Sequence, residues 1–184
     1  LWPAIFSESK KKEHIPDLIY IEIETIVREL LIKFHLNNPK SLLHRVLFDE
    51  KYQKLSLELF NNIPGGFSVE NDWGSYMFWG LDEKFHRVRL VLKDGKLCSP
   101  SGEHVYELTP LSIANALNNG KIFPGMLLCY LVVSLYYGMK CLGGFSQVND
   151  LTFLKNAWEK MLEQIGEKEE LKAVLPVQTK ELGG

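Results

Sequence analysis

The sequence predicts an α+β fold that is predominantly helical. Helical periodicity dominates both ends of the chain, strand-like alternation fills the middle, and one strongly apolar stretch lies between the strands and the last helix. Helices and strands that occupy separate parts of a chain are typical of α+β proteins. We expect a three- to four-stranded antiparallel meander over residues 73–108, packed on a central buried helix over residues 124–140.

A chain of 184 residues suits one domain. We expect this domain to span residues 15–165, with an arm before it and a charged, flexible tail after it. The expected divisions are an arm at 1–14, helices at 15–62, the meander at 73–108, helices at 109–165 and the tail at 166–184. Because the chain starts with Leu1 rather than Met, we also expect it to be a fragment of a larger protein.

Helical spacing of apolar residues predicts three helices in the first third of the chain. The first runs over 15–36, the second over 41–48 and the third over 49–60. Residues 18–26 also alternate, which leaves a strand open there, but the length of the pattern favours a helix. Glu22 and Glu24 within it are interpreted as a solvated face.

The middle of the chain carries the strand signals. An aromatic-rich run over 73–81 and the alternating run Arg87 to Leu92 predict two strands, and the Asp94-Gly95 pair predicts a tight hairpin to the next strand. A fourth strand is expected over 104–108. Together these strands form the expected meander.

The most apolar segment is Phe123 to Gly144. Its uninterrupted apolar run is about a dozen residues, whereas a membrane span needs about 20. We therefore expect a buried helix and no membrane span. Thr109-Pro110 predicts the cap and first position of a short helix before it. A polar loop over 145–150 is expected to lead into a last helix over 151–165.

Composition excludes some functional classes and favours others. The net charge of −2 and the pI near 6.2 give no reason to expect a nucleic-acid partner. Cys98, Cys129 and Cys141 form neither a Cys-x-x-Cys pair nor a disulfide framework, which favours the cytoplasm or another reducing compartment. The histidines lack metal-ligand spacing, so no metal site is predicted, and the sequence identifies no cofactor and no catalytic residue.

Two stretches carry candidate binding residues. Arg87 and Arg89 share one face of a predicted strand, with Trp79 on the strand before it, and arginines interleaved with aromatic residues can bind a planar or anionic ligand. The alternative is an ordinary half-buried sheet whose arginines face solvent.

The second stretch is the polar loop after the glycine pair Gly143-Gly144. Glycines before a helix can bring an anion to its free N–H groups, although such a pair also simply ends the preceding helix. The complete set of predicted ligand-binding residues is Trp79, Arg87, Arg89, Ser146, Gln147, Asn149 and Asp150.

Two functional classes remain open on the sequence alone. The first is the small-molecule-binding or catalytic part of a larger enzyme, acting on an anionic or polar metabolite in a pocket between the meander and the central helix. The second is a protein-interaction module without catalytic activity, which docks a protein partner through an exposed aromatic or helical face. A cleft with charged residues would favour the first class, and a large exposed apolar patch would favour the second.

Overall fold

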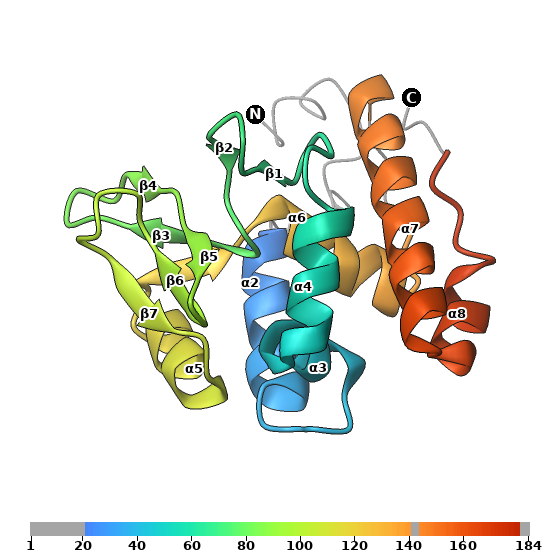
Figure 1. Cartoon of the computed structure of the whole chain (residues 1–184), viewed down its shortest axis with the longest axis horizontal. Helices are drawn as coiled ribbons and strands as arrows, with labels where there is room; N and C mark the ends of the chain where they lie inside the picture. Colours follow the sequence, from blue (N-terminus) through green and yellow to red (C-terminus); the bar gives the residue numbers. More distant parts are fainter. Residues whose placement is uncertain (1–20, 141–143, 181–184) are drawn as a thin grey trace, which may run out of the picture.

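The computed structural model describes residues 21–140 and 144–180, and it has the expected α+β architecture (Figure 1). The described residues form helices together with three small antiparallel sheets. Figure 1 shows most of the strands and α5 at one end of the molecule, α2 to α4 in the middle, and α7 with α8 at the other end. Among the described residues, none of the helices combines the length and the apolar character that crossing a membrane requires.

The N-terminal helices follow the predicted periodicity. The first described helix is α2 (Ile23–Leu30), which continues directly into the π-helical segment η2 (Leu31–His35). The predicted second and third helices are confirmed as α3 (Leu42–Phe48) and α4 (Glu50–Leu59). The Asp49 side chain caps α4 by accepting a hydrogen bond from the Lys51 N–H at 2.9 Å.

Eight short strands form the three sheets of the described residues. The first sheet pairs β1 (Phe67–Ser68) with β2 (Trp73–Gly74). The second has the order β4 (Arg87–Val88), β3 (Phe78–Leu81), β8 (Ile122–Pro124), and the third has the order β5 (Val91–Lys93), β6 (Lys96–Cys98), β7 (Val105–Glu107).

The strands of residues 73–108 do not form one continuous meander, which corrects the finer part of the prediction. The chain leaves β4 at Arg89, and the Leu90 backbone bonds with residues 75 and 76 instead: its carbonyl accepts from the Tyr76 N–H at 2.9 Å, and its N–H donates to Ser75 Oγ at 2.8 Å. The second sheet is completed by β8, whose last residue, Pro124, was expected to begin the central helix. The hairpin at Asp94-Gly95 is confirmed, since Lys93 pairs with Lys96 and both turn residues have positive φ.

The central apolar segment is helical and buried, but it is shorter than expected. It consists of α6 (Met126–Tyr130) and the π-helical segment η3 (Leu131–Tyr136), so the helical part covers 126–136 rather than 124–140. Pro124 belongs to β8 at one end, and Gly138 has a φ of +66° just past the other. The core includes residues of this segment together with residues from helices and strands elsewhere: Val27, Leu31, Leu43, Val46, Phe60, Tyr76, Phe78, Ile113, Leu128, Val132, Leu154, Trp158 and Met161.

The remaining described helices are α5 (Pro110–Asn118), α7 (Phe145–Ile165) and α8 (Lys168–Val174). Thr109 caps α5 as predicted, because its Oγ1 accepts from the Ser112 N–H at 3.3 Å. Residues 145–150, which we expected to be a loop, form the first turns of α7. The segment expected to be a tail contains α8, which packs against α7 and buries Val174.

Candidate functional site

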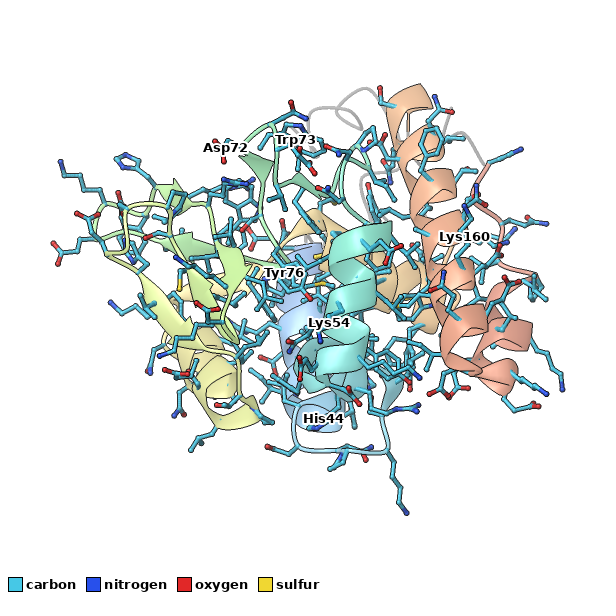
Figure 2. The ribbon with its side chains drawn as sticks, in the orientation of Figure 1. His44, Lys54, Asp72, Trp73, Tyr76 and Lys160 are labelled. Carbon is cyan, nitrogen blue, oxygen red and sulfur yellow. The ribbon has the colours of Figure 1, made fainter. Side chains whose placement is uncertain are left out.

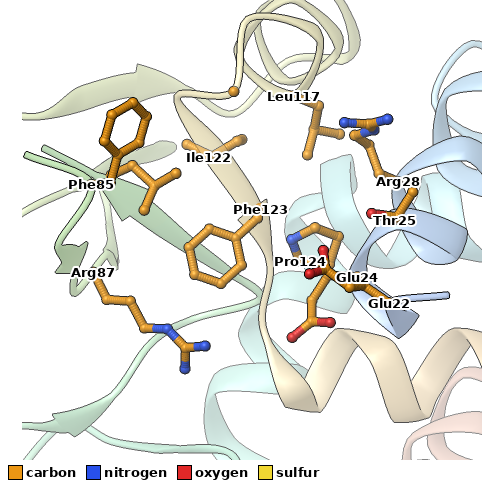
Figure 3. A pocket seen from close by; sticks show the side chains of 12 residues that line it. Glu22, Glu24, Thr25, Arg28, Phe85, Arg87, Leu117, Ile122, Phe123 and Pro124 are labelled. Atoms are coloured by element: carbon orange, nitrogen blue, oxygen red, sulfur yellow. The ribbon is translucent and has the colours of Figure 1, made fainter. Parts of the chain in front are cut away.

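A cavity of about 520 Å³ lies where α2 begins, between this helix, the β4-β3-β8 sheet and the end of α5 (Figure 3). We call it the α2 pocket. It is lined by residues from three stretches of the chain: Glu22, Glu24, Thr25, Arg28, Leu81, Phe85, Arg87, Leu117, Gly120, Ile122, Phe123 and Pro124.

Arg87 supplies a positive charge to one side of the α2 pocket. It is exposed at the start of β4, and its guanidinium carbon lies 5.4 Å from the centre of the Phe123 ring. Phe123 comes from β8, which pairs with β3 so that Phe123 faces Trp79 across the ladder. In the described part of the chain, no carboxylate forms an ion pair with Arg87. Among the described residues, the Arg87 charge is therefore balanced by an aromatic face and not by a carboxylate.

Glu22 and Glu24 supply negative charge to the same pocket. Glu22 is the N-cap residue of α2 and Glu24 lies in its first turn, where the helix dipole favours negative charge. Figure 3 shows the two glutamates and Arg87 on opposite sides of the Phe123 ring. Neither carboxylate forms an ion pair with another described residue. The pocket thus holds charges of both signs that do not neutralise each other directly.

Phe85 stands at the rim of the pocket, in the turn that joins β3 to β4. Its side chain is 81% exposed and its φ is +62°. The Asp82 carboxylate holds this turn, since Oδ1 accepts from the N–H groups of Lys84 and His86 at 2.8 Å each, and Oδ2 lies 3.0 Å from His86 Nδ1. These hydrogen bonds hold the pKa of Asp82 below its usual value, and the bond from the His86 backbone N–H contributes most.

Arg89 lies in a different setting from Arg87. Its Nε donates to the Gly74 carbonyl at 2.9 Å, Nη2 to the Ser68 carbonyl at 2.9 Å and Nη1 to Asp72 Oδ1 at 2.8 Å. Its side chain is 15% exposed. The guanidinium therefore ties the β1–β2 hairpin, which carries Asp72 and Trp73 in Figure 2, to the segment between β4 and β5.

Arg89 also borders a second cavity, of about 290 Å³, which is mainly apolar. Phe67, Tyr76 and Leu90 contribute to its wall. Tyr76 is buried in the middle of the molecule (Figure 2), where its hydroxyl lies 2.8 Å from Ser56 Oγ on α4. Although it borders this cavity, Arg89 uses three of its donors on two backbone carbonyls and Asp72, so its hydrogen bonds serve to hold the fold together.

The remaining predicted site residues do not line the α2 pocket. Ser146, Gln147, Asn149 and Asp150 lie in the first turns of α7, at the opposite end of the molecule from β3 and β4 in Figure 1. Trp79 is half-buried in β3 beside Phe123. Of the seven predicted residues, Arg87 therefore lines this pocket, and Glu22, Glu24, Phe85 and Phe123 are lining residues that sequence reasoning missed.

Two polar clusters elsewhere hold helices together. His35 Nδ1 lies 2.7 Å from Ser41 Oγ and His35 Nε2 lies 2.7 Å from the Tyr137 hydroxyl, which joins η2 to the end of η3. Burial lowers the pKa of His35.

Arg45 and the Tyr52 hydroxyl both form hydrogen bonds with Glu167, which ties α3 and α4 to the start of α8.

Metal ligation and similarity to known proteins add no further candidate. Among residues 21–140 and 144–180, no group of three or more His, Cys, Asp or Glu side chains is arranged to hold a metal ion. Comparison with protein-family models, curated proteins and solved structures gives no match for this chain. The geometry of the α2 pocket is therefore the basis for a functional proposal.

Proposed function

We propose that this chain is a ligand-binding domain that holds a small anionic or polar metabolite in the α2 pocket. The observation that carries the proposal is the Arg87 guanidinium, which lines the cavity against the Phe123 ring without a carboxylate partner among the described residues. A guanidinium in this position can form charge-assisted hydrogen bonds with a carboxylate or phosphate group of a ligand. The proposal assigns no catalytic residue.

The size of the cavity supports binding of a small molecule. Sites for metabolites and cofactors commonly measure about 300–1,000 Å³ and combine apolar walls with a few charged groups. The α2 pocket, at about 520 Å³, lies in this range, with Leu117, Ile122 and Phe123 among its apolar lining.

The distribution of exposed apolar residues supports this proposal over a protein-interaction module. Exposed large apolar side chains of the described residues stand on different elements, such as Phe85 in the β3–β4 turn, Leu111 on α5 and Phe34 on η2. Docking surfaces instead gather such side chains into one patch.

A thermal-shift screen of anionic and polar metabolites on the full chain tests the proposal. The variants are Arg87→Gln and, as a control that removes one exposed positive charge from α7, Lys160→Gln. We expect at least one metabolite to raise the Tm of the wild type and of Lys160→Gln, since a ligand that binds only the folded state stabilises it. The shift should be lost in Arg87→Gln, with affinity at least about tenfold weaker. The proposal is wrong if every observed shift survives in Arg87→Gln, or if no metabolite shifts the wild type.

A further inference from the structure

The turn that carries Phe85 is built in a way that does not favour phenylalanine. A φ of +62° belongs to the left-handed region, where a bulky residue is an outlier and glycine is the usual choice. The Asp82 carboxylate and the hydrogen bond from the Phe85 N–H to the Asp82 carbonyl, at 3.0 Å, hold the backbone there. A strained residue that the surrounding turn keeps in place points to a role beyond folding.

Burial does not explain why phenylalanine occupies this position. The Phe85 side chain is 81% exposed, so it contributes little to the core. It lies at the rim of the α2 pocket, in the turn of the sheet that carries Arg87 and Phe123. An exposed aromatic ring at the mouth of a cavity gains burial when a ligand with an apolar part enters.

The charges of the pocket restrict the ligand further. An anionic group suits the Arg87 side, whereas a cationic group suits Glu22, Glu24 and the face of an aromatic ring. Arg28 also lines the pocket on the α2 side, but its guanidinium is paired with Glu29 at 3.0 Å. A ligand that carries only one charge would pair with one side of the pocket and leave the charged side chains on the other side without a partner. Because the two sets of charges lie on opposite sides of the Phe123 ring (Figure 3), one ligand can pair both only if its own charges are well separated.

We infer that the ligand of the α2 pocket is a zwitterion whose cationic and anionic groups are separated by an apolar body, as in a short peptide with free ends. Its anionic end pairs with Arg87 and its cationic end with Glu22 and Glu24, while Phe85 packs on the body and determines specificity. This inference rests on the proposed function, because it names the ligand class of the same pocket. A simple α-amino acid fits less well, since its two charges stand on the same carbon atom.

Calorimetric titration of the full chain with four probes tests the charge requirement. The probes are the dipeptide phenylalanyl-glycine, its N-acetyl form, its C-terminal amide, and 6-aminohexanoate, which has separated charges but no aromatic body. We expect the free dipeptide to bind and each blocked form to bind at least tenfold more weakly. The 6-aminohexanoate probe should bind detectably but at least fivefold more weakly than the dipeptide. Equal binding of the free and blocked dipeptides, or no binding of the free one, would overturn the inference.

Variants separate the two parts of the inference. In the double variant Glu22→Gln and Glu24→Gln, the N-acetyl and free dipeptides should bind equally, because no carboxylate remains to distinguish them.

In Phe85→Gly the dipeptide should bind at least fivefold more weakly, while the Tm stays the same or rises. The control is Leu111→Ala, which removes an exposed apolar side chain on α5 outside the pocket and should leave binding unchanged. Unchanged dipeptide affinity in Phe85→Gly would refute the role of Phe85.

The two proposals can fail separately. If metabolites bind in a manner that depends on Arg87 while the dipeptides do not distinguish free from blocked ends, the proposed function stands and the zwitterion inference is wrong. If the screen yields no ligand that depends on Arg87 and the dipeptide does not bind, both are wrong.

Discussion

Arg87 and Arg89 stand on either side of Val88, yet they belong to two contrasting regions of the molecule. Around Arg89, two backbone carbonyls and Asp72 accept the guanidinium hydrogen bonds, and the side chain is 15% exposed. Around Arg87, the charge meets an aromatic ring, and the nearby glutamates form no ion pair with other described residues. Residue type and spacing alone therefore do not distinguish a structural arginine from one available to a ligand, whereas the hydrogen-bond partners do.

Other polar clusters of the described residues resemble the Arg89 region. His35 is held by Ser41 and Tyr137, and Glu167 is held by Arg45 and Tyr52. Changes in these clusters should therefore alter the free energy of unfolding, whereas changes around Arg87 should alter binding.

The largest expected effect is on stability, in Arg89→Ala. The substitution leaves the Ser68 and Gly74 carbonyls without their donor and frees the β1–β2 hairpin. We expect the free energy of unfolding to fall by about 3 kcal/mol, since hydrogen bonds from a charged group contribute more than neutral ones. Urea denaturation of Arg89→Ala beside Arg87→Ala measures the difference, and equal losses in the two variants would break the comparison.

The pH dependence of His35 gives the next effect. Burial lowers the pKa of His35 in the folded state, so below about pH 6.5 the unfolded state binds more protons and stability falls as pH falls. The slope from this group reaches at most about 1.4 kcal/mol per pH unit, between the unfolded and folded pKa values. We expect His35→Gln to lose part of the stability difference between pH 7.5 and pH 5.5. An unchanged difference would show that His35 does not titrate as its burial implies.

Phe85→Gly should move stability in the opposite direction. Glycine adopts positive φ without the steric cost that the Phe85 Cβ meets, so we expect the free energy of unfolding to rise by about 1 kcal/mol. Urea denaturation checks this value, with Phe85→Ala as the matched control that removes the ring and keeps the Cβ. If both variants gain equally, the strain does not arise from the backbone.

The smallest effect on stability is expected for Arg87→Gln. The loss is the exposed contact with the Phe123 ring, about 0.5 kcal/mol. Thermal unfolding without ligand measures it. A loss as large as that of Arg89→Ala would place Arg87 among the structural arginines and remove the contrast between the two regions.

Local chemistry in the sequence predicted several elements well. The Asp94-Gly95 hairpin and the Thr109 cap of α5 depend on neighbouring residues, and both are found as expected. Strand β8 was missed because Ile122–Pro124 continues an apolar run without a period of its own, and its strand character comes from pairing with the distant β3. The first turns of α7 were missed because Ser146, Asn149 and Asp150 have low helix propensity.

The candidate site was predictable only in part. Arg87 was identified because arginines near aromatic residues suggest a ligand. Glu22 and Glu24 resembled a solvated helix face, and no sequence pattern singled out Phe85. The pocket forms only when α2, the β3–β4 turn and β8 come together. Local sequence patterns do not predict such contacts between distant segments.

The most direct test of the account measures ligand-induced thermal shifts in the wild type, Arg87→Gln and Arg89→Gln with the same metabolites. We predict that Arg87→Gln lowers the Tm without ligand only slightly and loses the ligand-induced shift. Arg89→Gln should have a lower Tm without ligand and keep the shift. The opposite pattern, with binding lost in Arg89→Gln and kept in Arg87→Gln, would contradict the assignment of the α2 pocket as the binding site.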